Sequence, residues 1–189
     1  MRGAATRNDN QPAADSGAVP PVPPVPFVLR GLDPIVDQST RLVVLGSFPG
    51  VASLAAGQYY AHPRNQVWAI LSALWHEELR ALPYEQRLQV IRAHGLGLWD
   101  VYGSCLREGS LDSAIEQAEM NDLACLRRLA PQLRAVAHNG GESTRHRRIT
   151  ETLGVAVLRL PSTSPANASW SFDRKLAAWR AALTEHGVA

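Results

Sequence analysis

Short apolar runs and amphipathic stretches alternate along the chain from Phe27 onward. Four segments contain apolar runs, as expected of strands buried on both faces of a sheet: 41–46, 96–102, 134–140, which ends in a polar turn, and 155–165, which is a strand and the loop after it. The stretches between and after them have the pattern of helices with one buried face: 63–75, 84–94, 141–154 and 172–183. Asp112 and Asn121 are candidate N-caps of two further short helices. This alternation predicts a three-layer α/β/α sandwich with a central, mainly parallel sheet of about four strands.

Residues 1–26 differ from the rest of the chain. They are rich in Ala, Pro, Asn and Asp, lack apolar periodicity and end in PPVPPVP. This composition predicts a disordered, Pro-rich leader that precedes one folded domain at 27–189. The alternative, a docking segment for a partner that recognises proline, has no further support in the sequence. Because neither a signal peptide nor an apolar run of about 18 residues is found, we expect a cytoplasmic protein without a membrane anchor.

The charges of the chain are nearly balanced, since 19 Lys and Arg against 17 Asp and Glu give a net charge of +2. This balance excludes a histone-like polycation and confines any nucleic-acid surface to a local patch. The two cysteines, Cys105 and Cys125, are too few for an all-cysteine zinc or iron–sulfur site or for a disulfide-built scaffold. The six histidines lack the spacing of a metal site, so neither a metal nor another cofactor is expected.

Ligands of open α/β sheets bind beyond the carboxyl ends of the parallel strands. Here that rule selects four segments, which are also the most polar and turn-rich of the chain: 46–50, 99–102, 139–141 and 161–168. The sequence therefore predicts one site where these segments meet. Asp100, at the end of the second strand, is a candidate base there, and a cap or turn acceptor is an equal alternative.

The segment after the first strand, GSFPGVASLAAGQYYAHPRNQVW (46–68), is the most informative. It matches neither a P-loop nor a nucleophile elbow, but its turn can offer backbone N–H groups and the Ser47 hydroxyl to a ligand. The rings of Tyr59 and Tyr60 are candidates for stacking on a nucleobase, unless one is buried and the other covers the loop. Asn65, expected in the first turn of the next helix, could aim a water molecule or simply satisfy the backbone.

Two later segments add polar groups. Asn139 follows the third strand directly, and its carboxamide could contact the edge of a base or serve a turn. Ser162, Thr163 and Ser164 lie between two prolines and could meet a phosphate, or form an ordinary strand-to-helix connection. The basic cluster 145–148 is more typical of a solvated helix face than of a phosphate patch.

Together these segments resemble the uracil-DNA glycosylase superfamily. The stretch 46–68 is similar to its first motif, and LPSTSPANAS (160–169) is similar to its second. The ordered set GSFPG…QYYAHPRN, GLWDVYGSCLREGSLDSAI, HNG and LPSTSPA most resembles the hypoxanthine-DNA glycosylase branch. The resemblance covers about residues 28–185.

The resemblance implies roles for the site residues. Other branches carry a water-activating Asn or Asp where this chain has Phe48, and the hypoxanthine branch is thought to use the residue at Asn65 instead. Tyr60 would stack on an extruded base, and Asn139 with N–H groups near Ser47 and Phe48 would hydrogen-bond it as it departs. The loop that pinches the DNA backbone would contain Ser162, Thr163 and Ser164.

The implied protein is a monomeric, monofunctional enzyme of base excision repair that acts on DNA containing a deaminated base. Lys175, the only lysine, lies outside the site segments, so Schiff-base chemistry is not expected. Three alternatives stay open. The base could be uracil, because the Asn139 amide could face either way. Phe48 would suit an inactive nucleic-acid-binding module, and Ser47 with a histidine and Asp100 would suit an acyl hydrolase.

Overall fold

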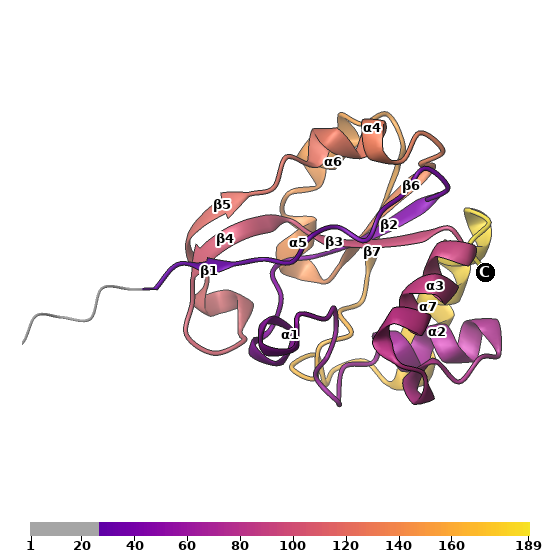
Figure 1. Ribbon diagram of the computed structural model, residues 1–189, viewed down its shortest axis with the longest axis horizontal. Coiled ribbons are helices and arrows are strands. Elements are labelled where there is room, and N and C mark those ends of the chain that lie inside the picture. Colours follow the sequence, from indigo (N-terminus) through magenta and orange to yellow (C-terminus); the bar gives the residue numbers. More distant parts are fainter. Residues whose placement is uncertain (1–26) are drawn as a thin grey trace, which may run out of the picture.

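The computed structural model describes residues 27–189, and a four-stranded parallel sheet lies at its centre (Figure 1). Its strands are β2 (Leu42–Gly46), β3 (Leu96–Asp100), β6 (Ala135–Asn139) and β7 (Ala156–Leu160), in the order β3-β2-β6-β7. All neighbouring pairs are parallel, and β2 and β3 are buried along their whole length. The expected central sheet is confirmed.

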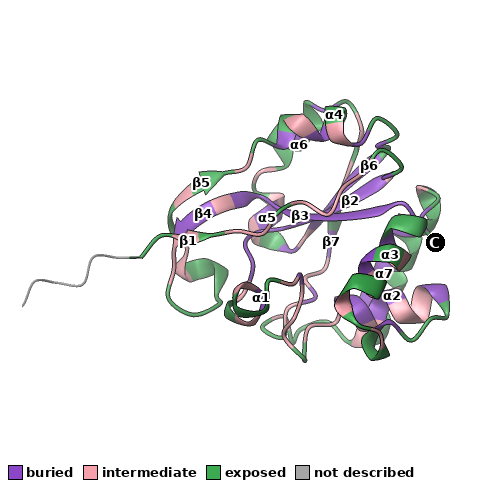
Figure 2. Cartoon of the chain, in the orientation of Figure 1, coloured by how far each residue is buried: buried purple, intermediate pink, exposed green. Residues whose placement is uncertain are grey.

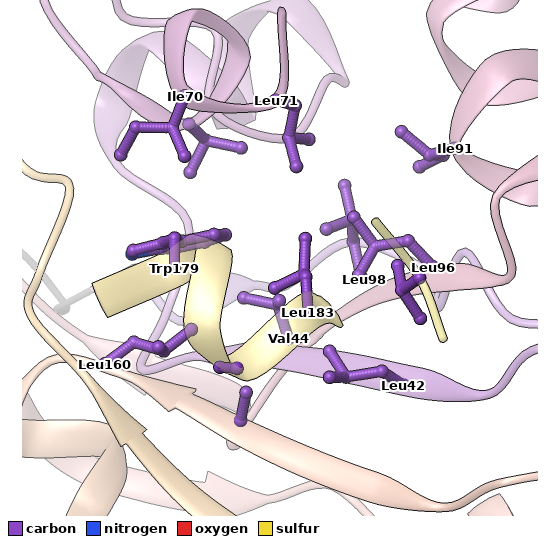
Figure 3. Close-up of a cluster of buried hydrophobic side chains, with 14 of the residues drawn as sticks. Leu42, Val44, Ile70, Leu71, Ile91, Leu96, Leu98, Leu160, Trp179 and Leu183 are labelled. Carbon is purple, nitrogen blue, oxygen red and sulfur yellow. The ribbon is translucent and has the colours of Figure 1, made fainter. Parts of the chain in front are cut away.

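Alternate side chains of β2 point to opposite faces of the sheet and enter two separate cores. Leu42 and Val44 join the core formed with α2 (Val67–Trp75), α3 (Tyr84–Ala93) and α7 (Phe172–Glu185) (Figure 3). Val43 and Leu45 join the core formed with η3 (Leu123–Cys125), α4 (Leu126–Leu129) and Leu153, which follows α6 (Arg147–Glu151). In Figure 2 the strands β2, β3 and β6 are mostly buried, and the helices on both sides expose their outer faces. The three-layer α/β/α sandwich is therefore confirmed.

A second, antiparallel sheet was not expected from the sequence. It consists of β1 (Leu29–Arg30), β4 (Tyr102–Leu106) and β5 (Glu116–Met120), in the order β1-β4-β5. The single strand expected over 96–102 is divided at Val101, whose N–H donates to the carbonyl of Gly46. β5 has no buried face, so it lacks the apolar alternation by which a strand is recognised.

Several expected boundaries are wrong for local reasons. α2 begins at Val67 instead of residue 63, because the Asn65 side chain accepts the Val67 N–H and holds the preceding chain in a turn. The stretch 141–154 forms two short helices, α5 (Gly141–Thr144) and α6, with a break at His146. By contrast, the segment 155–165 is a strand followed by a loop, as expected: β7 ends at Leu160, since Pro161 has no N–H to donate to a strand ladder.

Both predicted N-caps are wrong as well. Asp112 begins the short turn η2 (Asp112–Ala114), but its carboxylate accepts a hydroxyl of Ser47 instead of a backbone N–H. Asn121 donates to the carbonyl oxygen of Asp100, and the adjacent Asp122 caps η3. The long loop expected after the first strand contains α1 (Val51–Ala56), and η1 (Leu79–Ala81) precedes α3.

The leader predicted for residues 1–26 lies outside the described residues and stays a prediction. Within residues 27–189, no helix has both the length and the apolarity needed to cross a bilayer. Cys105 is buried in β4, Cys125 is partly buried at the end of η3, and both are free thiols.

Candidate active site

A cavity of about 370 Å³ opens at the carboxyl ends of β2, β3 and β6. All four segments selected from the sequence contribute to its wall, so the expectation of one common site agrees with the geometry. The wall contains every residue proposed from the sequence: Ser47, Phe48, Tyr60, Asn65, Asn139, Ser162, Thr163 and Ser164. Asp100 lines the same cavity.

A second cavity, of about 400 Å³, adjoins the first and shares part of its wall. We call the shared residues the mouth: Ser53, Tyr60, Asn65, Ser110, Leu111, Ser164 and Ala166. Twelve residues line the first cavity but not the second, and we call four of them, which lie at or just after the ends of the parallel strands, the inner end: Gly46, Asp100, Asn139 and Thr163. A ligand that enters from the mouth would therefore present its leading part to the inner end.

Tyr59 and Tyr60 have different roles in the fold. Tyr59 is buried, and its hydroxyl donates to the main-chain carbonyls of the 32–33 segment. Tyr60 lines the cavity in a left-handed backbone conformation, with φ of 54°, which is strained for a bulky side chain and is found mostly at functional sites. Burial, followed by the charge of Asp100, raises the pKa of the Tyr60 phenol above its ordinary value, so it stays protonated.

The carboxamide of Asn139 is held by its neighbours. Its Oδ1 accepts the Thr163 N–H at 3.1 Å, and its Nδ2 donates to Thr163 Oγ1 at 3.0 Å and to the Tyr60 hydroxyl at 3.3 Å. A backbone N–H can only donate, so it assigns the orientation of the amide. The orientation that the sequence left open is thus fixed, and both N–H groups of Asn139 already have acceptors.

The loop after β7 is organised largely by its own side chains. Ser162 Oγ accepts the N–H of Ser164, and Ser164 Oγ accepts the N–H of Ala166, each over two residues. Such bonds are typical of hydroxyl-stabilised turns. Thr163 is fully buried and directs its hydroxyl toward Asn139, so it supports the inner end instead of facing outward with the two serines.

Lys175 holds the loop after β7 in place through hydrogen bonds of its side chain. Its ammonium group donates to Gln66 Oε1 at 2.8 Å and to the carbonyl of Asn167 at 2.9 Å. Gln66 also donates its own N–H to the carbonyl of Thr163. The lysine is buried and does not line the cavity, although its neighbours in the loop do. The sequence offered no signal for this anchoring, because Lys175 lies in α7, far along the chain from Gln66.

Asn65 lies at the mouth and also satisfies the backbone. Its Oδ1 accepts the Val67 N–H at 3.0 Å, which is the structural role that the sequence had left as an alternative. A carbonyl oxygen has two lone pairs, so Oδ1 can still accept a hydrogen from water. The structure shows the backbone role of Asn65, and its role in aiming a water molecule stays a prediction.

Ser47 is bonded to a carboxylate and not to a histidine. Its Oγ donates to Asp112 Oδ1 at 2.5 Å. Burial raises the pKa of Asp112, and this hydrogen bond opposes the rise. Among the described residues, no histidine lines the first cavity, so the acyl hydrolase alternative lacks its base.

By the family resemblance, Phe48 stands at the position where other branches would carry a water-activating side chain. Its ring is buried in the second core and lies 4.9 Å from the guanidinium of Arg107, which also donates to the carbonyl of Pro49. This residue shapes the cavity wall without offering a polar side chain to it.

The sequence offered no reason to prefer Asp100 over the other polar residues of the cavity, but the structure distinguishes it from them. It pairs in register with Gly46, and a Cβ on Gly46 would overlap Asp100 Oδ1, so only glycine fits there. The side chain is buried, and its Oδ2 has no hydrogen-bond partner among the described residues. Burial, with a smaller effect of the Asp112 charge, raises the pKa of Asp100 to about 7. The sequence signal that could have identified Asp100 is a polar residue at the end of an apolar strand, next to a strand that ends in glycine.

The basic cluster 145–148 does not line the cavity. Arg145 pairs with Glu142 at 3.0 Å, and Arg147 pairs with Glu151 at 3.6 Å, each along the helix surface. In residues 27–189, no three His, Cys, Asp or Glu side chains gather closely enough to hold a metal ion.

Comparison with known proteins agrees with this geometry. The pattern of the Uracil DNA glycosylase superfamily matches residues 34–183. The chain is 36% identical over 146 residues to the hypoxanthine DNA glycosylase of Methanosarcina barkeri, covering 77% of this chain and 92% of that protein. It is 34% identical over 149 residues to the protein of the same name from Methanosarcina acetivorans, covering 79% and 94%.

A solved structure has the same fold. The solution NMR structure of a candidate uracil DNA glycosylase from Methanosarcina acetivorans superposes with a TM-score of 0.77 at 33% identity. The superposition covers 84% of this chain and 98% of the other. Since the family pattern spans most of the domain and both relatives exceed 30% identity over nearly their full length, the chain belongs to the uracil DNA glycosylase superfamily.

Proposed function

We propose that this protein is a monofunctional DNA glycosylase that releases hypoxanthine from DNA and leaves an abasic site for base excision repair. One observation carries the proposal: a single cavity at the strand ends joins an aromatic ring, a fixed amide network and Asn65 at its mouth. The names of the two Methanosarcina relatives support hypoxanthine as the base.

The first step is extrusion of the nucleotide from the duplex, because the glycosidic bond is out of reach while the base is stacked. The cavity has the volume of a typical small-molecule site and receives the base from the mouth. The Tyr60 ring stacks on the extruded base, and Asn139, through its hydroxyl bond, keeps that ring in place. The remaining lone pair of Asn139 Oδ1 is an acceptor for an N–H of the base.

The second step breaks the C1′–N bond, and its electron pair stays on the base. Backbone N–H groups of the Ser47–Phe48 turn stabilise the charge that develops there. A water molecule held by Asn65 bonds to C1′, and the proton that this water loses balances the charge of the departing base. Asn65 lies at the mouth, where the sugar of a nucleotide with its base at the inner end would lie.

No covalent intermediate is needed in this scheme. The only lysine of the chain is engaged with Gln66 and Asn167 and lies outside the cavity wall. An amine in that position does not reach C1′, which supports hydrolysis without strand cleavage.

Duplex oligonucleotides with one deoxyinosine, one deoxyuridine or only normal bases test the proposal. We expect an alkali-labile break at deoxyinosine, with the Asn65→Ala protein, purified in parallel, as the control for contaminating glycosylases. A faster break at deoxyuridine would reject the hypoxanthine preference but keep the glycosylase. Binding without any break would reject the enzyme and favour a nucleic-acid-binding module.

A further inference from the structure

Asp100 is a buried polar group that the proposed mechanism has not used. Asp100 lines the inner end of the cavity, its side chain is buried, and no described side chain or backbone group bonds to its Oδ2. Buried polar atoms are paired in nearly all native structures, so the missing partner of this carboxyl group is water or a ligand.

Several side-chain donors near the inner end are already engaged. Both N–H groups of Asn139 donate within the protein, and the Ser47 hydroxyl donates to Asp112. A protonated Asp100 is a donor that is left free for a ligand at the inner end.

The chemistry of the departing base decides which protonation state is useful. The base accepts the electron pair of the C1′–N bond, so an ionised carboxylate beside it would repel the developing charge. A neutral carboxyl group would instead donate a hydrogen bond that strengthens as the charge develops. Carboxyl groups in apolar surroundings are kept neutral for this purpose at other enzyme sites.

Four titratable or charged side chains face Asp100 from neighbouring elements: Arg107 after β4, Asp112 in η2, and Tyr59 and Tyr60 before α2. Burial and the charge of Asp112 favour the neutral carboxyl, and Arg107 opposes them. Asp112 is itself influenced by Glu142 on α5. The net effect, which is due mainly to burial, is to raise the pKa of Asp100 to about 7, so the neutral form is well populated at physiological pH.

Building on the proposed glycosylase function, we propose that Asp100 acts in its protonated form and donates a hydrogen bond from its carboxyl group to the exocyclic carbonyl oxygen of the extruded base. Deamination replaces an exocyclic amino group by this oxygen. The amino group of adenine cannot accept the hydrogen of the neutral carboxyl, so adenine would lack this bond. Asp100 thereby contributes both to base selection and to stabilisation of the departing base.

The pH dependence of single-turnover cleavage tests the protonation state. With deoxyinosine duplex, the wild-type rate should be constant below pH 7 and fall about tenfold per pH unit well above it. Asp100→Asn, which is isosteric and does not titrate, should cleave without this alkaline fall. Asp112→Asn should move the fall to lower pH, and Asp122→Asn, remote from the cavity, should leave it in place. The wild type and the three variants are tested with the same deoxyinosine duplex. Any effect from titration of the base itself therefore appears in all four pH profiles and does not distinguish them.

A second substrate tests the contact with the carbonyl. Unsubstituted purine deoxyriboside has a hydrogen where hypoxanthine has its oxygen, so the wild type should cleave it at least about tenfold more slowly. In Asp100→Leu, which cannot donate, the difference between the two substrates should shrink at least about threefold, and the remaining difference reflects the N1–H that purine also lacks. Thermal melting is the check that the variant folds.

The outcomes separate the two proposals. If the wild type cleaves neither deoxyinosine nor deoxyuridine, the proposed function fails and this inference fails with it. If the wild type cleaves deoxyinosine but Asp100→Asn keeps the same pH profile, only the inference is overturned. A wild-type rate that rises through pH 7 and becomes flat in Asp100→Asn would also overturn it, because Asp100 would then act as an ionised base.

Discussion

The inner end and the mouth of the cavity hold their polar groups in different ways. At the inner end, Asn139 and Thr163 bond to each other, and Asp100 is sealed against Gly46. At the mouth, Asn65 and Ser164 lie on loops and bond mainly to backbone groups nearby. Groups whose orientation is fixed by hydrogen bonds can select a ligand of one shape and one hydrogen-bonding pattern. Groups on loops that still have free donors or acceptors can instead bind water and the sugar–phosphate backbone. We therefore propose that the inner end selects the base and that hydrolysis takes place at the mouth.

The largest effect is expected at the mouth. Asn65→Ala should lower the single-turnover rate about 100-fold or more, because a group that orients the nucleophile is removed. The loss should be equal for deoxyinosine and deoxyuridine, and DNA binding should change little, since phosphate contacts lie elsewhere. Asn65→Asp, which keeps an acceptor for the Val67 N–H, controls for the lost turn. Cleavage by Asn65→Ala within about threefold of wild type would reject the role of Asn65.

Tyr60 connects the two ends, since its ring lies at the mouth and its hydroxyl bonds to Asn139. Stacking on a base is worth about 1–3 kcal/mol, so Tyr60→Ala should reduce cleavage about 5- to 150-fold. Tyr60→Phe keeps the ring and should lose much less. Melting curves should place the Tyr60→Ala protein within about 1–2 kcal/mol of wild type. A larger loss of stability would mean that the ring is needed mainly for the core.

The buried carboxyl of Asp100 makes stability depend on pH at the inner end. Its pKa is about 7 in the folded protein and near 3.8 when unfolded, so between these values the folded state binds a proton that the unfolded state releases. The contribution of Asp100 to stability is therefore present below about pH 4 and is lost as the pH rises through 7. Asp100→Asn should melt at a similar temperature to wild type at pH 4 and several degrees higher at pH 8. An equal difference at both pH values would contradict the raised pKa.

The smallest effect is expected for Thr163→Val, which keeps the shape of the inner end but removes one acceptor of Asn139. A single hydrogen bond contributes about 1 kcal/mol, so the free energy of unfolding should fall by about that amount. Cleavage should fall modestly and the preference for the base should weaken, because the amide is less firmly oriented. An unchanged melting point together with unchanged base preference would show that the amide network is not required.

The regular core could be predicted from the sequence because its signals are local. The apolar runs of β2 and β3 are buried on both faces, and the stripe Trp179 to Leu183 lies on the core face of α7. The site was found through a topological rule, since parallel strands bring distant segments to one edge of the sheet. The resemblance to a family then suggested roles for Asn65 and Tyr60, which pattern alone did not distinguish from structural roles.

The remaining features depend on contacts between distant residues. β5 exposes nearly all of its side chains, so it leaves no pattern. The Lys175 ammonium group meets Gln66 across a separation of 109 residues, and the Ser47–Asp112 bond spans 65 residues. Asp100 is distinguished by an Oδ2 atom that has no hydrogen-bond partner among the described residues. An unpaired atom of this kind can be recognised only in a three-dimensional structure.

A crystal structure of Asn65→Ala bound to a duplex with one deoxyinosine would test the division of the cavity most directly. We expect the hypoxanthine base outside the duplex, stacked on Tyr60, with its carbonyl oxygen within hydrogen-bond distance of the Asp100 carboxyl group and C1′ facing position 65. A base that stays stacked in the duplex, or one that lies with its sugar at the inner end, would contradict the account.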